Sequence, residues 1–330
     1  MIQYPTILWN ARRHELRLET EGTLMITMTI GENEKDQRVD RYLLKLLSQA
    51  TRAQVFSWIR KKTIRVNGKS ASENQRLLLG DTVELRFSDE AFKELSFQKE
   101  MPMSHTYKLD IVYEDEEILV VNKPAGLLTH PDKEEYVETL STYVLSYLKP
   151  YCTRMFKPAS IQRLDKNTSG MVLFGKTYDS VRKYNAMMRE RQIHKYYQCI
   201  AEGKISKSGE ICGYLYKDED TNKVSIVSEP DDRHSLYVQT RYNPIASTRD
   251  YTLVEVELLT GRSHQIRASL AAIGHPIYGD SKYGAKSRIK KNQVLHAYKL
   301  EFEGRTLTCP NPEGDKLWRQ LTGGAGEGSS

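Results

Sequence analysis

The chain has 330 residues, 39% of them hydrophobic, and a formal net charge of +6. This length is ordinary for two domains and allows sizeable cores. The sequence contains no run of about 18 apolar residues and no secretory signal pattern, so we expect a cytoplasmic protein that does not span a membrane. Its four cysteines are scattered and form no CxxC-type pair, and its eight histidines form no HExxH motif. Both observations argue against a disulfide framework and a metal site.

The two ends of the chain differ from its middle in composition. Residues 1–24 are polar without a sustained period, and the chain closes on the small polar letters GGAGEGSS. We therefore assign residues 1–30 to an N-terminal extension and residues 322–330 to a flexible tail. The sequence does not decide whether translation starts at Met1, Met25 or Met28. We expect a chain that begins at Met25 to fold and to modify RNA as well as the full chain.

Two helices are predicted at the start of residues 31–90. The letters RVDRYLLKLL place four apolar side chains on one helical face: Val39, Leu43, Leu46 and Leu47. A second helix opens at Thr51, and Gln54 three residues later completes a capping-box pattern.

Short strands follow these helices. The letters TIRVNGK alternate apolar and polar side chains before Asn67-Gly68, a dipeptide that favours a tight hairpin turn. The letters DTVELRF then alternate Val83, Leu85 and Phe87 as a closing strand. Residues 31–90 thus form a small α+β unit in which two helices precede the strands.

This unit resembles the αL RNA-binding fold, which a small-subunit ribosomal protein shares with many RNA-modifying enzymes. The resemblance rests on RVDRYL, IRKKTIRVNGK and GDTVEL. The segment from Arg52 to Ser72 contains six basic residues and no acidic residue. The basic residues are Arg52, Arg60, Lys61, Lys62, Arg65 and Lys69. Such a cluster neutralises RNA phosphates and releases counterions. The alternative is a solvated helix face.

Residues 91–105 have mixed charge and no clear period, and we predict a linker. Beyond it, residues 106–321 are rich in strands that follow one another directly. Strands are predicted at 111–126, 169–176, 195–203, 224–228, 236–242 and 251–259, and helices at 179–192 and 264–274, the last closed by Gly274. This order favours an α+β domain around a mixed, mostly antiparallel sheet.

Five ordered motifs in this domain resemble the A-type family of ribosomal large-subunit pseudouridine synthases. They are VVNKPAGLLTHP, IQRLDKNTSGMVLFGK, HKYYQCIAEG, TGRSHQIRASLAAIGHPIYGDSKYG and VLHAYKLEF. Within the family the C-type members, which act on 23S rRNA, are the most similar. Gln162 is a departure, because the family usually has histidine there. The resemblance implies an isomerase that requires neither a cofactor nor a metal, since the reaction conserves all atoms of the uridine.

The resemblance also implies the catalytic residues. Asp165 matches the family's catalytic aspartate and is expected to act as a nucleophile or an electrostatic partner toward ribose or uracil. Arg267 is expected to pair with it and keep it ionised in a dry pocket. Tyr197 matches the active-site tyrosine, whose ring stacks on uracil. Read locally, Asp165 is a turn residue and Tyr197 a core aromatic.

Further residues are implied in RNA contact. Arg163 is expected to enter the RNA stack when the target base is extruded, because a buried carboxylate cannot reach a stacked uridine. Arg262 is expected to touch the substrate backbone or to brace the site, Leu295 to line the base pocket, and Lys123 to help hold RNA. The alternatives are a surface arginine for Arg163 and a core leucine for Leu295.

Together these observations predict a monomeric enzyme that isomerises uridines of RNA. Its expected partner is 23S rRNA or a large-subunit precursor. One alternative is a transfer-RNA pseudouridine synthase of the same family. Another, of a different class, is a non-catalytic RNA-binding factor in ribosome assembly.

Overall fold

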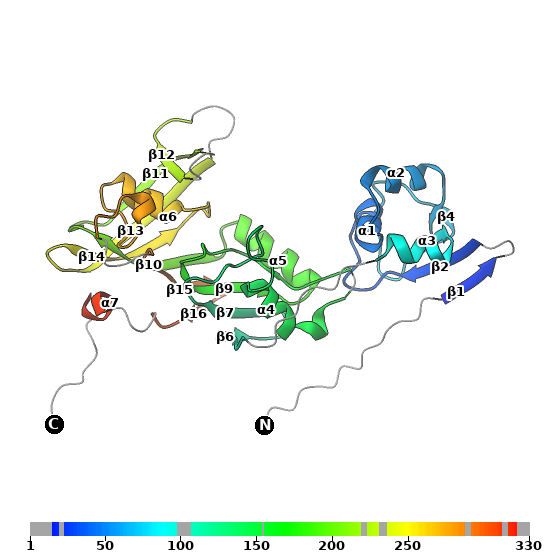
Figure 1. Ribbon diagram of the computed structural model, residues 1–330, viewed down its shortest axis with the longest axis horizontal. Helices are drawn as coiled ribbons and strands as arrows, with labels where there is room; N and C mark the ends of the chain where they lie inside the picture. The colour runs from blue at the N-terminus through cyan, green and yellow to red at the C-terminus, as the bar shows by residue number, and fades with distance from the viewer. Residues whose placement is uncertain are drawn as a thin grey trace, which may run out of the picture. The chain divides into compact units, whose positions relative to one another are not determined.

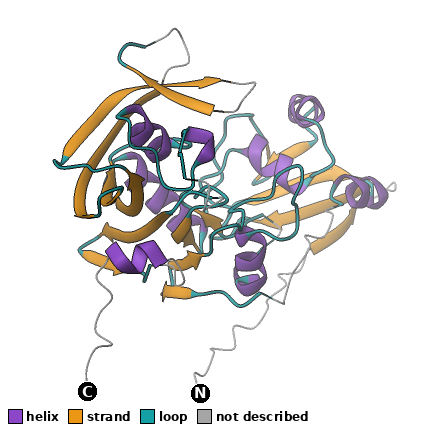
Figure 2. Ribbon diagram, turned by 60° about the vertical axis from the view of Figure 1, so that its left-hand side comes forward, coloured by secondary structure: helices purple, strands orange, loops and turns teal. Residues whose placement is uncertain are grey.

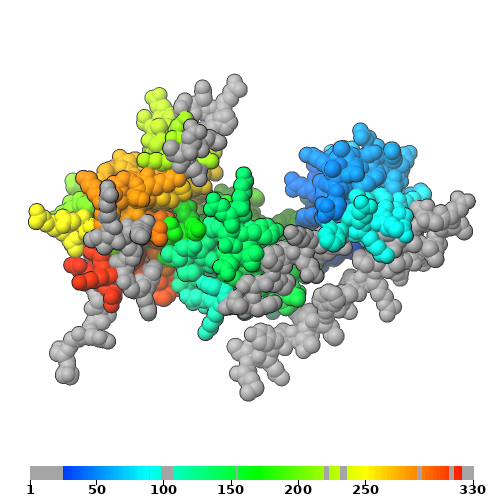
Figure 3. Space-filling model, in the orientation of Figure 1, coloured from blue at the N-terminus to red at the C-terminus, as the bar shows by residue number. Residues whose placement is uncertain are grey.

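The computed structural model describes residues 15–19, 23–97, 107–153, 155–218, 223–230, 236–287, 292–311 and 316–321. The chain divides into two compact units. Unit 1 comprises Met1–Met103, Leu145–Ala159 and Gly175–Arg182, and unit 2 comprises Ser104–Val144, Ser160–Phe174 and Lys183–Ser330. The yellow, orange and red residues of Figure 3 all belong to unit 2. In the described part of the chain, no helix is long and apolar enough to cross a membrane.

Unit 1 is built on a sheet of five strands in the order β1-β2-β5-β3-β4 (Figure 1). Strand β2 (Thr23–Thr29) pairs antiparallel with β1 (Glu15–Glu19) and with β5 (Thr82–Phe87). Residues 23–30, which we had assigned to an extension, are therefore part of this unit. The alternation of Ile26 and Ile30 with polar residues explains the difference, because both side chains are buried in the core.

The two predicted helices are present. Helix α1 (Val39–Leu46) buries the apolar face expected of it, and α2 (Arg52–Arg60) begins after Thr51. The predicted capping box has formed: the Gln54 N–H donates to Thr51 Oγ1 at 3.3 Å, and the Thr51 N–H donates to Gln54 Oε1 at 2.8 Å.

The predicted hairpin joins β3 (Ile64–Val66) to β4 (Lys69–Ser70). Asn67 and Gly68 both have positive φ, at 51° and 74°, as a type I′ turn requires. The Asn67 side chain also accepts a hydrogen bond from the Thr82 N–H at 2.8 Å, so the turn is fixed to β5.

The predicted linker begins with structure. Helix α3 (Asp89–Leu95) is capped by Ser88, whose Oγ accepts from the Ala91 N–H, and Phe92 and Leu95 pack against the core. Two helical turns are too short to show a clear period, which is why the sequence did not predict this helix. Residues 98–105 of the predicted linker lie outside the described residues.

Two segments of the predicted catalytic domain also belong to unit 1. They are Leu145–Ala159, which includes the 3-10 turn η1 (Lys149–Tyr151), and Gly175–Arg182. Met155 is buried in the core of this unit, and Arg182 Nη1 lies 2.7 Å from Asp36 Oδ2. These long-range contacts leave no signal in sequence periodicity.

A truncation series tests the role of β2. A chain beginning at Met25 loses β1 but keeps Ile26 and Ile30, each 1% exposed. We expect it to unfold within a few degrees of the full chain. A chain beginning at Gly31 should lose at least about 3 kcal/mol of unfolding free energy, because deleting one buried isoleucine side chain costs about 2–5 kcal/mol. Equal thermal unfolding of the two truncated chains would contradict this.

The larger sheet has 11 strands. Figure 2 draws the strands of the protein in orange. The strands of the larger sheet are β6 (Ile111–Glu114), β7 (Ile118–Lys123), β8 (Ala159–Ser160), β9 (Ser169–Gly175), β10 (His194–Glu202), β11 (Gly209–Asp218), β12 (Lys223–Val227), β13 (Leu236–Ser247), β14 (Tyr251–Leu258), β15 (Leu295–Phe302) and β16 (Arg305–Thr308). The main path runs β12-β11-β13-β14-β10-β15-β9-β7-β6. The sheet is mixed and mostly antiparallel, as predicted, and β15 and β9 pair in parallel.

Helices complete the catalytic part of the chain: α4 (Leu140–Tyr147), α5 (Tyr178–Arg189), α6 (Gln265–Ala272) and α7 (Lys316–Leu321), with the 3-10 turn η3 (Ser281–Tyr283). Helices α5 and α6 were predicted, whereas α4 and α7 were not. The single strand predicted at 111–126 is two strands, because Asp115 accepts hydrogen bonds from the Glu117 and Ile118 N–H groups and turns the chain.

A close backbone approach places the loop between β8 and β9. Gly170 has φ of 114°, and a Cβ atom there would lie 2.3 Å from the Ala297 carbonyl oxygen on β15. Only glycine fits this position. The start of β9, directly after this loop, is therefore held against β15, the strand that carries Leu295.

Candidate active site

Asp165 lies on this loop. Its carbonyl oxygen accepts from the Thr168 N–H at 3.0 Å, which closes a turn, and its side chain is 28% exposed. Arg267 Nη1 lies 3.2 Å from Asp165 Oδ2, and His264 Nε2 lies 3.9 Å from the same oxygen. Two side chains at the start of α6 thus meet a carboxylate that lies 102 positions before Arg267 in the sequence.

Arg267 has a second carboxylate partner that sequence reasoning missed. Its Nε and Nη2 donate to the two oxygens of Asp280 at 2.7 and 2.9 Å, and Asp280 is 2% exposed. The Tyr283 ring stacks on the guanidinium at 4.8 Å. Asp280 stands in the letters GHPIYGDSKYG, the end of one of the five motifs, and no role was predicted for it. The two contacts fix the guanidinium, and its remaining Nη1 faces Asp165.

The electrostatics of Arg267 follow from this arrangement. Burial lowers its pKa, but hydrogen bonds and charge from Asp280, and then from Asp165, outweigh burial and raise it. The guanidinium stays charged, and it is 8% exposed at the side chain. A permanent positive charge therefore lies beside Asp165.

A pocket of about 520 Å³ opens around Asp165. Its lining brings together six residues that the sequence motifs singled out: Arg163, Asp165, Tyr197, Arg262, Arg267 and Leu295. Among the described residues that line the pocket, Asp165 is the sole carboxylate. The other charged side chains of the lining are basic, and Arg189, Arg191 and Lys195 were not predicted there. A volume of this size suits a small organic group.

Tyr197 projects from β10 into the pocket and is 6% exposed. Its neighbours across the sheet are Val256 on β14 and Ala297 on β15. Burial and the charge of Asp165 both raise the pKa of the Tyr197 hydroxyl, which therefore stays protonated. Tyr196 does not line the pocket, and its ring packs under Lys299 Nζ at 3.8 Å, as strand alternation predicts.

Lys123 does not face solvent, which corrects the expectation that it helps hold RNA. It is fully buried, and its Nζ donates to the carbonyl oxygens of Pro124, Leu127 and Lys166 at 2.7–2.9 Å. Burial lowers its pKa to about 7, against the charge of Asp165, which raises it. Lys123 instead ties the loop after β7 to the residue that follows Asp165.

Gln162 occupies the position where the resemblance expected histidine. Its Nε2 donates to the Met171 carbonyl oxygen at 3.4 Å, and it lies in the pocket lining. Among the described residues, no group of three His, Cys, Asp or Glu side chains has the arrangement of a metal site.

The basic cluster of unit 1 lies on one short stretch of chain. Five of its six members are exposed and Arg65 is partly exposed. They occupy α2, the turn after it and the β3–β4 hairpin, and none forms an ion pair with another described residue. Their positive charge is therefore open to an external anion.

Comparisons with known proteins bear on both units. Residues 117–272 match the family model described as RNA pseudouridylate synthase, and residues 37–83 match the S4 domain. An uncharacterised RNA pseudouridine synthase of Bacillus subtilis is 31% identical over 84% of this chain and 89% of its own length. The ribosomal large subunit pseudouridine synthase D of Neisseria meningitidis serogroup B is 31% identical over 92% of this chain and 82% of its own length.

Solved structures support the fold. Human RNA pseudouridylate synthase domain containing 4 superposes with a TM-score of 0.52 at 22% identity, covering 62% of this chain and 88% of that one. The ribosomal relative carries a D-type name, and the predicted likeness to the C type stays a prediction. The expected fold class and the RNA-binding module are confirmed. The chain belongs to the family of RNA pseudouridine synthases, and it is an intramolecular isomerase with an S4 RNA-binding domain.

Proposed function

We propose that the enzyme converts uridines of 23S rRNA to pseudouridine with Asp165 as the nucleophile. The observation that carries this proposal is that Asp165 is the sole carboxylate among the described residues of a basic pocket. The reaction breaks the N1–C1′ bond of uridine and forms a C5–C1′ bond. C5 loses its proton and N1 gains one, so the atoms balance. An ionised carboxylate in the pocket suits attack on the sugar or the ring.

Arg267 keeps Asp165 reactive. When RNA closes the pocket, loss of water disfavours the carboxylate anion, and the guanidinium at 3.2 Å opposes that effect. Because Asp280 binds the other edge of the guanidinium, Arg267 does not need to move when the substrate enters. This preorganisation lowers the cost of reaching the transition state.

Tyr197 serves as a stacking surface and as a proton donor. Its raised pKa makes the phenolate costly, so the hydroxyl donates hydrogen bonds and does not act as a base in its resting form. Leu295, 5% exposed, supplies an apolar wall of the same pocket. A flat, uncharged base fits between such walls.

Arg163 takes the place of the extruded base. It is exposed and lines the pocket only two residues before Asp165, so it lies where the RNA stack is interrupted. Arg262, exposed in the loop before α6, contacts the substrate backbone. Both roles follow from position and charge, because neither side chain forms an ion pair with a described residue.

The substrate assignment rests on the relatives and on the S4 domain. The ribosomal large subunit is named in the relatives from Nitrosomonas, Neisseria and Vibrio, at 28–31% identity. The basic cluster of unit 1 supplies affinity for a large RNA. We further infer that the RNA-binding domain extends to residue 97. The catalytic domain lies within 106–321, apart from Leu145–Ala159 and Gly175–Arg182, which belong to unit 1.

Neutralising part of the basic cluster tests this division of labour. Replacing Arg60, Lys61 and Lys62 by glutamine should reduce the salt slope of 23S rRNA binding by about two to three units, roughly one per lost phosphate contact. The matched control replaces three exposed basic residues that do not line the pocket, namely Lys204, Lys207 and Arg249. An unchanged slope with lowered stability would mean that the cluster is a solvated face.

A pseudouridine-specific primer-extension map tests the substrate. RNA is taken from cells that have the gene and from cells that lack it, and 23S rRNA and transfer RNA are mapped in parallel. Loss of 23S signals that the wild-type gene restores and the Asp165→Asn gene does not supports the proposal. Signals lost only from transfer RNA favour the family's other substrate class. Identical maps favour a non-catalytic assembly factor.

A further inference from the structure

The C-terminal end of helix α5 adopts an unusual conformation at the rim of the pocket. The Gln192 N–H donates to the Met187 carbonyl oxygen at 2.8 Å, and the Arg191 N–H donates to that of Met188 at 3.4 Å. This pair of bonds is a Schellman motif, and Arg191 occupies its left-handed position with φ of 60°. Glycine is the usual residue there, because a Cβ atom makes the left-handed region unfavourable.

The same unit contains the motif in its common form. Helix α6 ends with bonds from the Gly274 N–H to the Ala271 carbonyl oxygen and from the His275 N–H to that of Leu270. Gly274, with φ of 83°, holds the left-handed position. Two helices of one domain therefore end alike, one with glycine and the other with arginine. Arg191 therefore carries a conformational cost that Gly274, in the same position at the end of α6, avoids.

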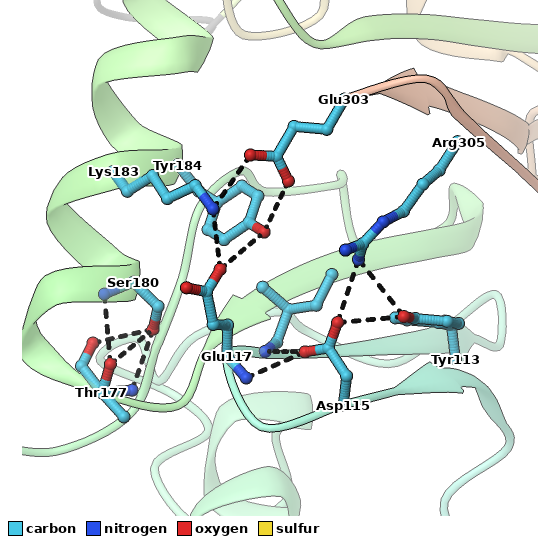
Figure 4. Close-up of polar contacts among 10 residues, drawn as sticks. Tyr113, Asp115, Glu117, Thr177, Ser180, Lys183, Tyr184, Glu303 and Arg305 are labelled. Atoms are coloured by element: carbon cyan, nitrogen blue, oxygen red, sulfur yellow. Dashed lines mark hydrogen bonds and ion pairs between the residues drawn. The ribbon is translucent and has the colours of Figure 1, made fainter.

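Helix α5 is firmly anchored, so this end is not a frayed terminus (Figure 4). Lys183 Nζ lies 2.8 Å from Glu117 and 2.9 Å from Glu303, and the buried hydroxyl of Tyr184 donates to both carboxylates. The two glutamates stand in turns next to β7 and β15. The anchor fixes the helix whose last turn reaches the pocket.

Arg189 and Arg191 both line the pocket and are exposed. Neither forms an ion pair with a described residue, although Asp165 lines the same pocket and is paired to Arg267 instead. Helix-dipole attraction favours a cation at this end, but an exposed arginine in the last helical turn, such as Arg189, satisfies it without left-handed strain. A second left-handed basic residue, Lys62 with φ of 59°, ends helix α2 with the same pair of bonds and belongs to the basic cluster of unit 1. Arg191 is thus a left-handed arginine at the rim of the pocket, and its charge has no ion-pair partner among the described residues.

We propose that Arg191, assisted by Arg189, binds a backbone phosphate of the RNA strand beside the target uridine and so positions that uridine over Asp165. This inference rests on the proposed function. The recognised group is a phosphate diester, which a guanidinium binds with two parallel hydrogen bonds. Arg191 lies just beyond the end of α5 and lines the pocket that contains Asp165.

The substitution Arg191→Gly distinguishes phosphate binding by Arg191 from a purely structural role. It is expected to maintain or raise the thermal stability while lowering the activity. Glycine relieves the backbone strain, so we expect the Tm of the full-length protein to equal or exceed that of the wild type. Loss of the phosphate contact should lower single-turnover kcat/KM about tenfold. It should also reduce the salt slope of RNA binding by nearly one unit. The probe is 23S rRNA transcribed with uridine tritiated at C5, and released tritium is counted.

Two further variants complete the experiment. Arg191→Lys keeps the charge and the strain, and it should retain the salt slope while losing part of kcat/KM. Arg249→Gln removes an exposed arginine that does not line the pocket, and it should behave like the wild type. Wild-type kcat/KM and slope in Arg191→Gly would overturn the proposal, as would parallel losses of Tm and activity. Absence of tritium release from the wild type would instead overturn the 23S assignment.

Discussion

Replacing Asp165 with asparagine is expected to reduce isomerisation by at least about 10³-fold while the fold and RNA binding survive. Asparagine keeps the shape of the side chain and removes the anion that attacks or stabilises the substrate. The fold should tolerate the change, because Asp165 is 28% exposed and Arg267 keeps its two hydrogen bonds to Asp280. No buried charge is left without a partner.

The measurement is tritium release from C5-labelled 23S rRNA under single-turnover conditions, with filter binding and thermal unfolding on the same samples. The matched control is Asp250→Asn, which neutralises an exposed carboxylate in the turn before β14. Its activity should equal that of the wild type. Substantial product from Asp165→Asn would remove Asp165 from the nucleophile role and with it the centre of the proposed mechanism.

Local signals predicted the elements that are stabilised locally. Val39, Leu43 and the Thr51 capping box defined two helices, and Asn67-Gly68 defined a hairpin, because each pattern acts within a few residues. Strand β2 was missed because it was grouped with the polar segment that precedes it, and helix α3 was missed because it has only two turns. Their positions depend on packing against distant residues, which periodicity does not record.

The candidate active site, too, could be predicted from the sequence only in part. The motifs named Asp165, Tyr197 and Arg267, but their meeting depends on contacts across more than 100 residues, which the resemblance supplied and composition did not. Asp280 was missed because an aspartate that follows a glycine and precedes a serine is typical of a turn. Its burial, and the buried contacts of Lys123, become visible only when the surrounding strands are in place.

Asp280 changes what is expected of Arg267→Leu. The sequence motifs paired Arg267 with Asp165 alone. The structure places the greater cost on Asp280, which is 2% exposed and would become a buried, unpaired anion. We expect Arg267→Leu to lower the unfolding free energy by about 3–5 kcal/mol, because breaking a buried ion pair from one side leaves an uncompensated charge. Arg262→Leu, which removes an exposed arginine of the same pocket, should leave stability unchanged and weaken RNA binding.

The double variant Arg267→Leu/Asp280→Asn separates stability from catalysis. It removes both buried charges, so urea unfolding should recover most of the lost free energy. Turnover should stay severely reduced, because nothing restores a cation beside Asp165. In the Asp165→Asn background, Arg267→Leu should still destabilise the protein yet do little further harm to turnover, as coupled catalytic groups behave. If Asp280→Asn failed to restore stability, the cost of losing Arg267 would lie in packing, including its stacked contact with Tyr283, and not in the buried charge.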